Sequence, residues 1–151
     1  MTPTLLSKVE PPLGRMFSFL GKGYLQLLRT KLNHLDIDRN YYALVLIESF
    51  EGEVTQQELA LLLDSDKVSI VRVIDYLSEK GYVTRTRNTD DRRKYSLILT
   101  EKAKKALPEI RKCFAEINEI ALKGLRNSQI SELTDVIKII KNNITENIQT
   151  L

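Results

Sequence analysis

Positively charged side chains gather in two neighbouring segments of this chain, and their types and spacing suit contacts to a nucleic acid. In the first segment, apolar residues at positions 70, 73, 74 and 77 follow the spacing of a helix with one buried face. The opposite face would present Lys67 and Arg72 to phosphates or guanine edges, and the helix N-terminus would add an attraction for phosphate. Ser69 could bond phosphate or base, while Val68 and Val71 could meet thymine methyl groups. The alternative is a solvated helix whose valines pack on a neighbouring element.

The second segment carries five cations and two anions between residues 85 and 94, a net charge of +3. Its residues alternate with a period of two around a polar turn, which predicts a β-hairpin. An arginine at a hairpin tip can enter a narrow minor groove, where negative potential is concentrated, and an adjacent aspartate can hold its guanidinium. A solvated surface turn is the alternative. The charged residues are Arg85, Arg87, Arg92, Arg93 and Lys94, with Asp90 and Asp91.

Sequence patterns on either side predict the elements that position these residues. Apolar residues over 17–35 repeat with the helical period, and Asp38 is placed to cap a second helix that Gly52 closes. Residues 55–58, Thr-Gln-Gln-Glu, have the form of a capping box and open a third helix of about ten residues. The helix over 67–80 would follow after a tight turn, with Gly81 just past its end.

A helix-turn-helix followed by a hairpin is a winged helix-turn-helix, so we expect a mainly α chain with a small β-hairpin wing. The strands are predicted at Tyr82–Arg87 and Lys94–Leu99, and two further helices at Thr100 and near Ser128. We expect one chain, 1–151, in which residues 38–100 form the winged helix-turn-helix lobe and residues 1–36 and 101–151 form a helical dimerisation region.

Composition argues against several classes of function. One cysteine and one histidine cannot form a tetrahedral Cys/His zinc site or a disulfide, and no Ser/His/Asp set or phosphate-binding glycine loop is visible. We therefore expect no enzyme, no metal and no cofactor. The longest apolar stretch, Ala43–Ile47, is far too short to span a membrane, and residues 1–12 lack the apolar stretch of a signal peptide. A cytoplasmic protein is expected.

Residues 55–100 resemble the winged helix-turn-helix of the MarR family of bacterial regulators. In one matching stretch, Asp91-Arg92-Arg93 is followed by five residues and then by Leu99-Thr100, which is the spacing between the Asp-x-Arg and Leu-Thr motifs of the family. The order of elements extends the resemblance over about Leu13–Ile148. The three matching stretches are Gln57–Ala60, Val73–Val83 and Asp91–Lys102.

The resemblance implies a role for each matching residue. Arg93 would enter the minor groove, oriented by Asp91, and Asp75 would anchor a wing arginine such as Arg85. The chain has valines at two positions where family members often have Ser or Thr, which affects base preference and not the binding mode. The residues expected to read the major groove are Lys67, Ser69, Val71 and Arg72.

The resemblance also implies a homodimer, because helices from both ends of such chains pair across a two-fold axis. Its operator would be an inverted repeat with half-sites roughly 10 bp apart, bound most often by a repressor. The alternative is that these helices cover their own domain. Apolar residues beyond that need are Leu5, Leu6, Ile144, Ile148 and Leu151.

Members of the family commonly release DNA when a small aromatic or anionic ligand binds between the dimerisation helices and the DNA-binding lobe, or when a cysteine is oxidised. Candidate lining residues here are Tyr24, His34, Tyr41 and Tyr42, although aromatic residues at helical spacing are more often core. Cys113 is expected to be a buried, inert thiol, because the family's peroxide sensors carry their cysteine near the N-terminus.

A winged-helix module that contacts only proteins is the alternative function. The charge distribution favours DNA: residues 65–105 hold eleven Lys/Arg and six Asp/Glu, a net charge of +5, against +3 for the whole chain. The rest of the chain therefore has a net charge of −2. A module that binds only proteins has no need of cations concentrated in this way.

Overall fold

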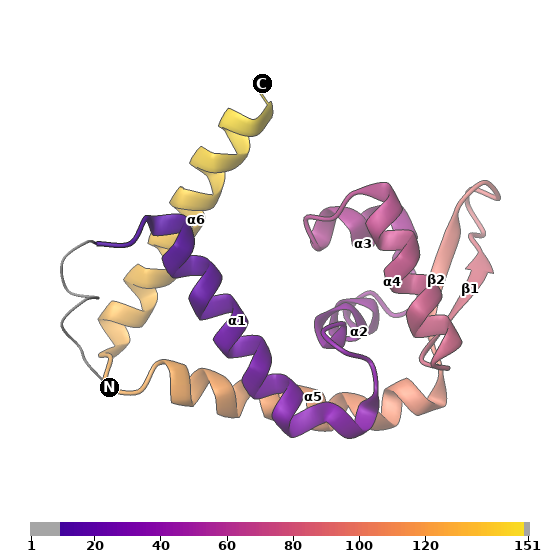
Figure 1. Cartoon of the computed structure of the whole chain (residues 1–151). Coiled ribbons are helices and arrows are strands. Elements are labelled where there is room, and N and C mark those ends of the chain that lie inside the picture. The colour runs from indigo at the N-terminus through magenta and orange to yellow at the C-terminus, as the bar shows by residue number, and fades with distance from the viewer. Residues whose placement is uncertain (1–9, 150–151) are drawn as a thin grey trace. The chain divides into compact units, whose positions relative to one another are not determined.

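The structure, a computed structural model, describes residues 10–149, and it is mainly helical with one antiparallel β-hairpin (Figure 1). The predicted fold class is confirmed. The chain divides after Ile117 into two compact units, and each is described here by itself. The elements in chain order are α1 (Leu13–Leu32), the 3₁₀ turn η2 (Asn33–Leu35), α2 (Tyr41–Ser49), α3 (Gln56–Leu62), α4 (Lys67–Glu79), β1 (Val83–Arg87), β2 (Tyr95–Leu99), α5 (Glu101–Ala121) and α6 (Asn127–Gln149).

The connection between α1 and α2 differs from the prediction. Asp38 does not cap α2, which begins at Tyr41 after Asn40 and has no side-chain cap. The backbone of Asp38 is left-handed, with φ of 51°, and its carboxylate pairs with Arg29 instead. Aspartate is one of the few residues that tolerates this conformation, so it supports a turn here and not a helix start.

The capping box at the start of α3 is confirmed. The hydroxyl of Thr55 accepts a hydrogen bond from the backbone amide of Glu58 (3.2 Å), and the Glu58 carboxylate accepts one from the backbone amide of Thr55 (2.8 Å). Helix α3 has seven residues and is shorter than predicted. The chain leaves the helix at Leu63 and turns through Asp64, whose φ is 49°.

Helix α4 buries one face on the core and is capped at both ends. Ile70, Ile74 and Leu77 are buried as predicted, whereas Val73 is only partly buried. The Asp66 side chain caps the N-terminus, and Gly81 follows the C-terminus with a φ of +78°, a conformation that glycine adopts without strain.

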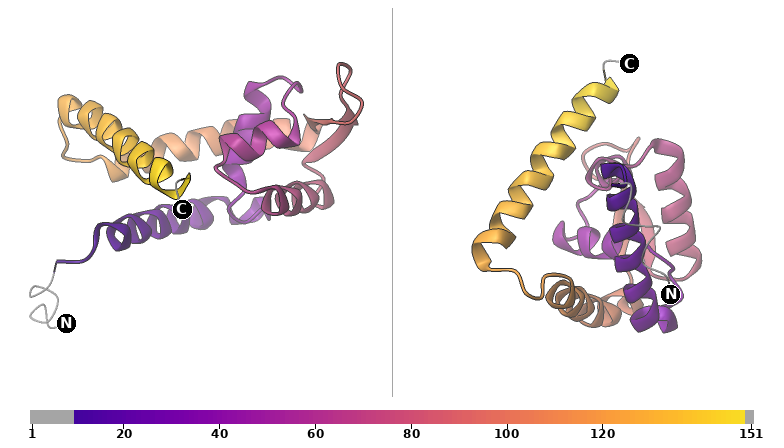
Figure 2. Two further views of the ribbon diagram at one scale, coloured as in Figure 1. Left: turned by 90° about the horizontal axis from the view of Figure 1, so that it is seen from above. Right: turned by 60° about the vertical axis from the view of Figure 1, so that its left-hand side comes forward.

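The hairpin is the wing. Its register places Val83 opposite Leu99 and Arg87 opposite Tyr95, and each strand begins one residue later than predicted. Val83, Leu97 and Leu99 are buried, so one face of the hairpin closes the core. The turn that joins β1 and β2 projects away from the helices on which the hairpin packs (Figures 1 and 2).

Helix α5 joins α1 and α2 to the core of the first unit. Its buried face includes Leu107, Ile110 and Ile117, and its polar edge contacts α1, η2 and α2. The ion pairs are Lys31–Glu116 (2.9 Å) and Glu48–Arg111, and His34 of η2 forms a hydrogen bond with Glu109 (3.0 Å).

In the second unit, α6 is one long helix with no buried residue (Figure 2). Its apolar side chains remain exposed, among them Ile144 (53%) and Ile148 (65%). A single amphipathic helix cannot bury its own apolar face, so these side chains require a partner surface. Three further apolar residues of the sequence prediction, Leu5, Leu6 and Leu151, lie outside the described residues.

Candidate nucleic-acid interface

The outward face of α4 has the composition that the sequence predicted. Its side chains are exposed, and the apolar members are far from the core: Val68 is 62% exposed and Val71 is 39% exposed. Exposed valines that lie between two cations on a helix are suited to the major groove of DNA, where the methyl groups of thymine offer apolar contacts. The exposed residues of this face are Lys67, Val68, Ser69, Val71 and Arg72.

The start of α4 is occupied by a carboxylate. Asp66 accepts hydrogen bonds from the backbone amides of Val68 (2.9 Å) and Ser69 (2.8 Å) and from the Ser69 hydroxyl (2.8 Å). These bonds, those of Ser69 first, hold the pKa of the Asp66 carboxyl below its ordinary value. The amides expected to attract a phosphate are therefore already used, and the hydroxyl donor of Ser69 is engaged as well.

Arg85 lies between the wing and two helices. Its guanidinium pairs with Asp75 of α4 at 2.6 Å, the ion pair that the sequence predicted, and its Nε donates to the Gln56 side-chain oxygen of α3 at 3.2 Å. The Arg85 side chain is 28% exposed. These contacts join β1, α4 and α3 through one planar group whose donors have fixed directions.

Two short polar side chains organise the wing turn. The Asn88 side-chain oxygen accepts from the backbone amides of Asp90 (2.9 Å) and Asp91 (3.1 Å), while its amide nitrogen donates to Ser96 (2.8 Å). The Asp91 carboxylate accepts from the Arg93 backbone amide (3.0 Å), so it orients the chain at Arg93. Asn88 has no role in the sequence prediction beyond the polar turn, although asparagine in a turn is a signal for such bonds.

The cations of the wing differ in their surroundings. Arg85 is half-buried by its two partners, whereas the four other cations of the wing are exposed. The exposed cations are Arg87, Arg92, Arg93 and Lys94.

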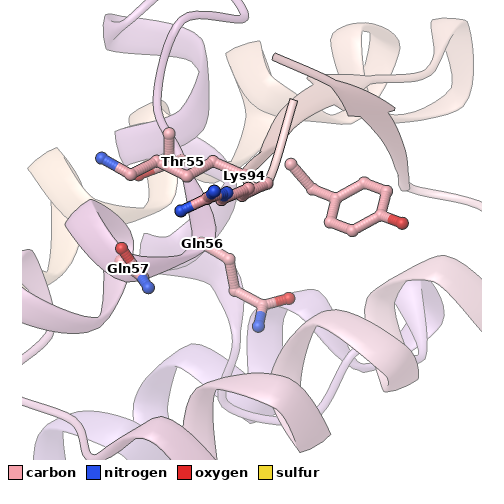
Figure 3. A pocket seen from close by; sticks show the side chains of 6 residues that line it. Thr55, Gln56, Gln57 and Lys94 are labelled. Atoms are coloured by element: carbon pink, nitrogen blue, oxygen red, sulfur yellow. The ribbon is translucent and has the colours of Figure 1, made fainter. Parts of the chain in front are cut away.

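Two surface hollows flank the start of α3. The first lies toward the wing, and Figure 3 shows Gln56 and Gln57 leaving the helix start in different directions beside it. The second lies toward α4, and the same two glutamines line it as well. Sequence analysis assigned neither glutamine a role, although Gln57 belongs to a matching stretch. The first hollow is lined by Thr55, Gln56, Gln57, Arg93, Lys94 and Tyr95, and the second by Gln56, Gln57, Ala60, Leu61, Ser65, Asp66, Lys67, Ile70 and Val71.

The four candidate effector residues have different environments, and none of them lines either hollow. Tyr41 is buried, and its hydroxyl donates to the Leu32 carbonyl at 3.5 Å. Tyr42 packs edge-on against Phe114 of α5, with ring centroids 6.4 Å apart. The remaining two are His34, which is exposed and bonded to Glu109, and Tyr24, which is partly buried against the core.

Other chemistry finds little support in the part of the chain that the structure describes. Cys113 is buried in α5, and burial raises the pKa of its thiol, which disfavours the reactive thiolate. Within residues 10–149 there is no group of three or more His, Cys, Asp or Glu side chains that could hold a metal ion. No helix in that range is long and apolar enough to cross a membrane.

Comparison with known proteins finds a match to one family. The family model described as "MarR family" matches residues 38–94, which include α2, α3, α4, β1 and the wing turn. This segment therefore resembles the winged helix-turn-helix of the MarR family. The resemblance inferred from the sequence is therefore confirmed.

Solved structures extend the likeness beyond the matched segment. A MarR transcriptional regulator from Methanosarcina mazei Go1 is 29% identical, with a TM-score of 0.74 over 89% of this chain and 96% of that chain. The transcriptional regulator SlyA is 25% identical, with a TM-score of 0.83 over 91% and 96%. A putative MarR family regulator from Listeria monocytogenes, in complex with a 26mer DNA, is 23% identical with a TM-score of 0.80 over 91% and 92%, and it shows the shared fold. The chain thus has the fold of MarR-family transcriptional regulators.

Proposed function

We propose that this chain is a sequence-specific regulator of transcription that binds double-stranded DNA as a homodimer. The observation that carries the proposal is the exposed set of cations on two adjacent elements of one lobe. They are Lys67 and Arg72 on α4 and Arg87, Arg92, Arg93 and Lys94 on the wing.

In the proposed complex, α4 lies in the major groove and the wing reaches the adjacent minor groove. Val68 and Val71 contact thymine methyl groups, while Lys67 and Arg72 contact phosphates or guanine edges. Arg93 enters the minor groove from a turn that Asn88 and Asp91 hold in shape. The regulator from Listeria monocytogenes, which was solved with a 26mer DNA, supports DNA as the partner by analogy.

The homodimer is proposed because α1 and α6 each expose apolar side chains, which are unfavourable in water and would be buried against a second chain. On α1, Phe19 is 76% exposed and Leu20 is 62% exposed. A two-fold axis would place two α4 helices about one DNA turn apart, which predicts an inverted-repeat operator with half-sites roughly 10 bp apart. The proposal includes repression, which is the commonest direction of regulation in the family that the sequence resembles, and a cytoplasmic location.

Release of DNA by a small aromatic or anionic effector is part of the proposal, with Tyr24, His34, Tyr41 and Tyr42 as the candidate lining. The support is limited to their positions: His34 and Tyr42 contact α5, and Tyr41 contacts the last turn of α1. A ligand that separated these contacts would disturb the elements that support the DNA-binding lobe.

Selection of bound duplexes from a random DNA pool tests the function without a guess about the operator. An enriched inverted repeat with roughly one-turn spacing is the expected result. A folded, dimeric protein that enriches no sequence at low salt would instead favour the alternative of a winged-helix module that contacts only proteins.

The role of the wing is tested with Arg93→Ala on the selected duplex. We expect affinity to fall at least about tenfold with the fold and the dimer intact, because the variant loses a minor-groove contact. The matched control is Arg15→Ala, which removes an exposed arginine from α1. Equal affinities for wild type and Arg93→Ala would exclude a wing contact, and an equal loss in Arg15→Ala would make the effect one of net charge.

A further inference from the structure

The side-chain amide of Gln56 has a fixed orientation. Arginine has only donors, so the Gln56 atom that faces the Arg85 Nε at 3.2 Å must be the carbonyl oxygen. The Nε2 amide group therefore points away from Arg85. Asp75 of α4 holds another nitrogen of the same guanidinium at 2.6 Å, so Arg85, itself fixed by Asp75, sets the orientation of Gln56.

Cations lie on both sides of this amide. Gln56 lines the hollow toward the wing together with Arg93 and Lys94, and it lines the hollow toward α4 together with Lys67. The carboxylate of Asp66 also lines the second hollow, but its oxygens already accept bonds from two backbone amides and one hydroxyl. The surroundings of Gln56 are therefore suited to an anion.

We infer that the Gln56 amide donates a hydrogen bond to a phosphate oxygen of the DNA backbone, and that Arg85 and Asp75 position it. The inference rests on the proposed function and deepens it. Arg85 then acts through Gln56 and need not touch DNA, which agrees with its half-buried guanidinium.

A phosphate is a better partner than a base edge for this amide. Gln56 belongs to α3, while the side chains placed to read bases belong to α4 and the wing tip. Contacts to phosphates from outside the reading helix fix the register of a protein on the duplex and carry no base information. Gln56 would thus set the height and tilt at which α4 enters the groove.

The experiment measures the affinity of the selected operator duplex with single phosphates replaced, one at a time, by neutral methylphosphonates. In wild type, neutralising the phosphate that Gln56 contacts should lower affinity about tenfold. Gln56→Met, which keeps the side-chain length and lacks the donor, should bind unmodified DNA less tightly and should lose clearly less affinity than wild type when that one phosphate is neutralised, because only the attraction to the neighbouring cations is then removed. Gln57→Met is the matched control and should retain the full cost of the replacement there.

A second variant separates contact from support. Gln56→Glu keeps an acceptor for Arg85 and loses the amide donor. If Gln56 served only to hold Arg85, this variant would lose as much affinity as wild type at each replaced phosphate. We expect instead that, as in Gln56→Met, replacing the contacted phosphate lowers the affinity of this variant less than that of wild type. If wild-type protein binds the operator but no single replacement costs it more affinity than it costs the Gln56 variants, the inference alone is overturned. If wild-type protein binds no DNA, the proposed function is overturned as well.

Discussion

An acidic side chain on a DNA-binding surface normally repels the phosphates, and Asp75 is such a residue: it is exposed on α4, near the cations that would contact DNA. Its carboxylate is paired with Arg85 at 2.6 Å, and Arg85 is in turn bonded to Gln56. The charge of Asp75 is therefore partly neutralised, and its effect on DNA binding is a matter of positioning.

We predict that Asp75→Ala lowers DNA affinity about fivefold or more, although it removes a negative charge. The physical reason is that the guanidinium of Arg85 loses the partner that fixes it, so Gln56 is no longer oriented. The control is Asp90→Ala in the wing turn, where the same change of charge should leave affinity unchanged or raise it. An affinity for Asp75→Ala above that of wild type would show that charge repulsion, and not positioning, dominates.

At this scale the sequence predicted which side chains are exposed more reliably than which ones are bonded. The helical period fixes the outward face of α4, so Lys67, Val68 and Arg72 were found from spacing alone. The contact between Gln56 and Arg85 joins residues 29 positions apart, and no local pattern encodes it. The Asp38 prediction failed because a local rule, that aspartate caps helices, competed with a left-handed backbone.

At the scale of elements, the C-terminal end of α4 is held from two directions. The Tyr76 hydroxyl donates to the Asp36 carbonyl (3.1 Å), and Lys80 pairs with the Asp36 carboxylate. On the other side the ammonium of Lys102 donates to the Lys80 carbonyl (2.7 Å) and lies 4.4 Å from the centroid of the Tyr82 ring. The loop after α1 and the start of α5 therefore fix α4 at the end away from Asp66. Sequence analysis predicted each of these helices but could not predict the contacts, because they depend on the packing of distant segments.

The capping box of α3 makes the stability of this lobe depend on pH. Hydrogen bonds from the backbone amide and then the hydroxyl of Thr55 hold the pKa of Glu58 below its ordinary value. A lowered pKa in the folded state means that the ionised carboxylate stabilises the fold at neutral pH, and that this stabilisation is lost as pH falls through the folded pKa.

We predict that Glu58→Gln lowers the free energy of unfolding at pH 7 and that the difference from wild type shrinks as pH falls below the ordinary glutamate pKa of about 4.3 and through the lowered pKa of the folded state. Urea unfolding at a series of pH values measures the difference. Thr55→Ala, which removes the hydroxyl of the same box, should cost about 1 kcal/mol at pH 7. A difference between wild type and Glu58→Gln that stays constant from pH 7 to pH 3 would contradict the linkage.

At the scale of the whole molecule, the exposed apolar side chains of α6 carry the argument for a dimer. Residues 130, 133, 137, 140, 144 and 148 recur along one side of this helix, and none of them is buried. Burying a leucine or isoleucine is worth about 2 kcal/mol, so a helix with this stripe is far more stable against a partner than in water. The sequence revealed the stripe, because it is periodic, but not the surface that covers it.

We predict that Ile144→Lys converts the dimer to monomer at micromolar concentration and abolishes binding to the inverted repeat. The lysine places a charge in the apolar stripe, where isoleucine is 53% exposed in a single chain and would be buried in a dimer. Sedimentation velocity checks the mass, with wild type expected at about twice 17.4 kDa. The matched control, Thr145→Lys, adds the same charge one residue further on, off the stripe, and should remain dimeric. An added lysine by itself favours binding to DNA, so loss of binding in Ile144→Lys, but not in Thr145→Lys, would show that operator recognition requires the dimer. A wild-type protein that sediments at 17.4 kDa would contradict the dimer and, with it, the proposed inverted-repeat operator.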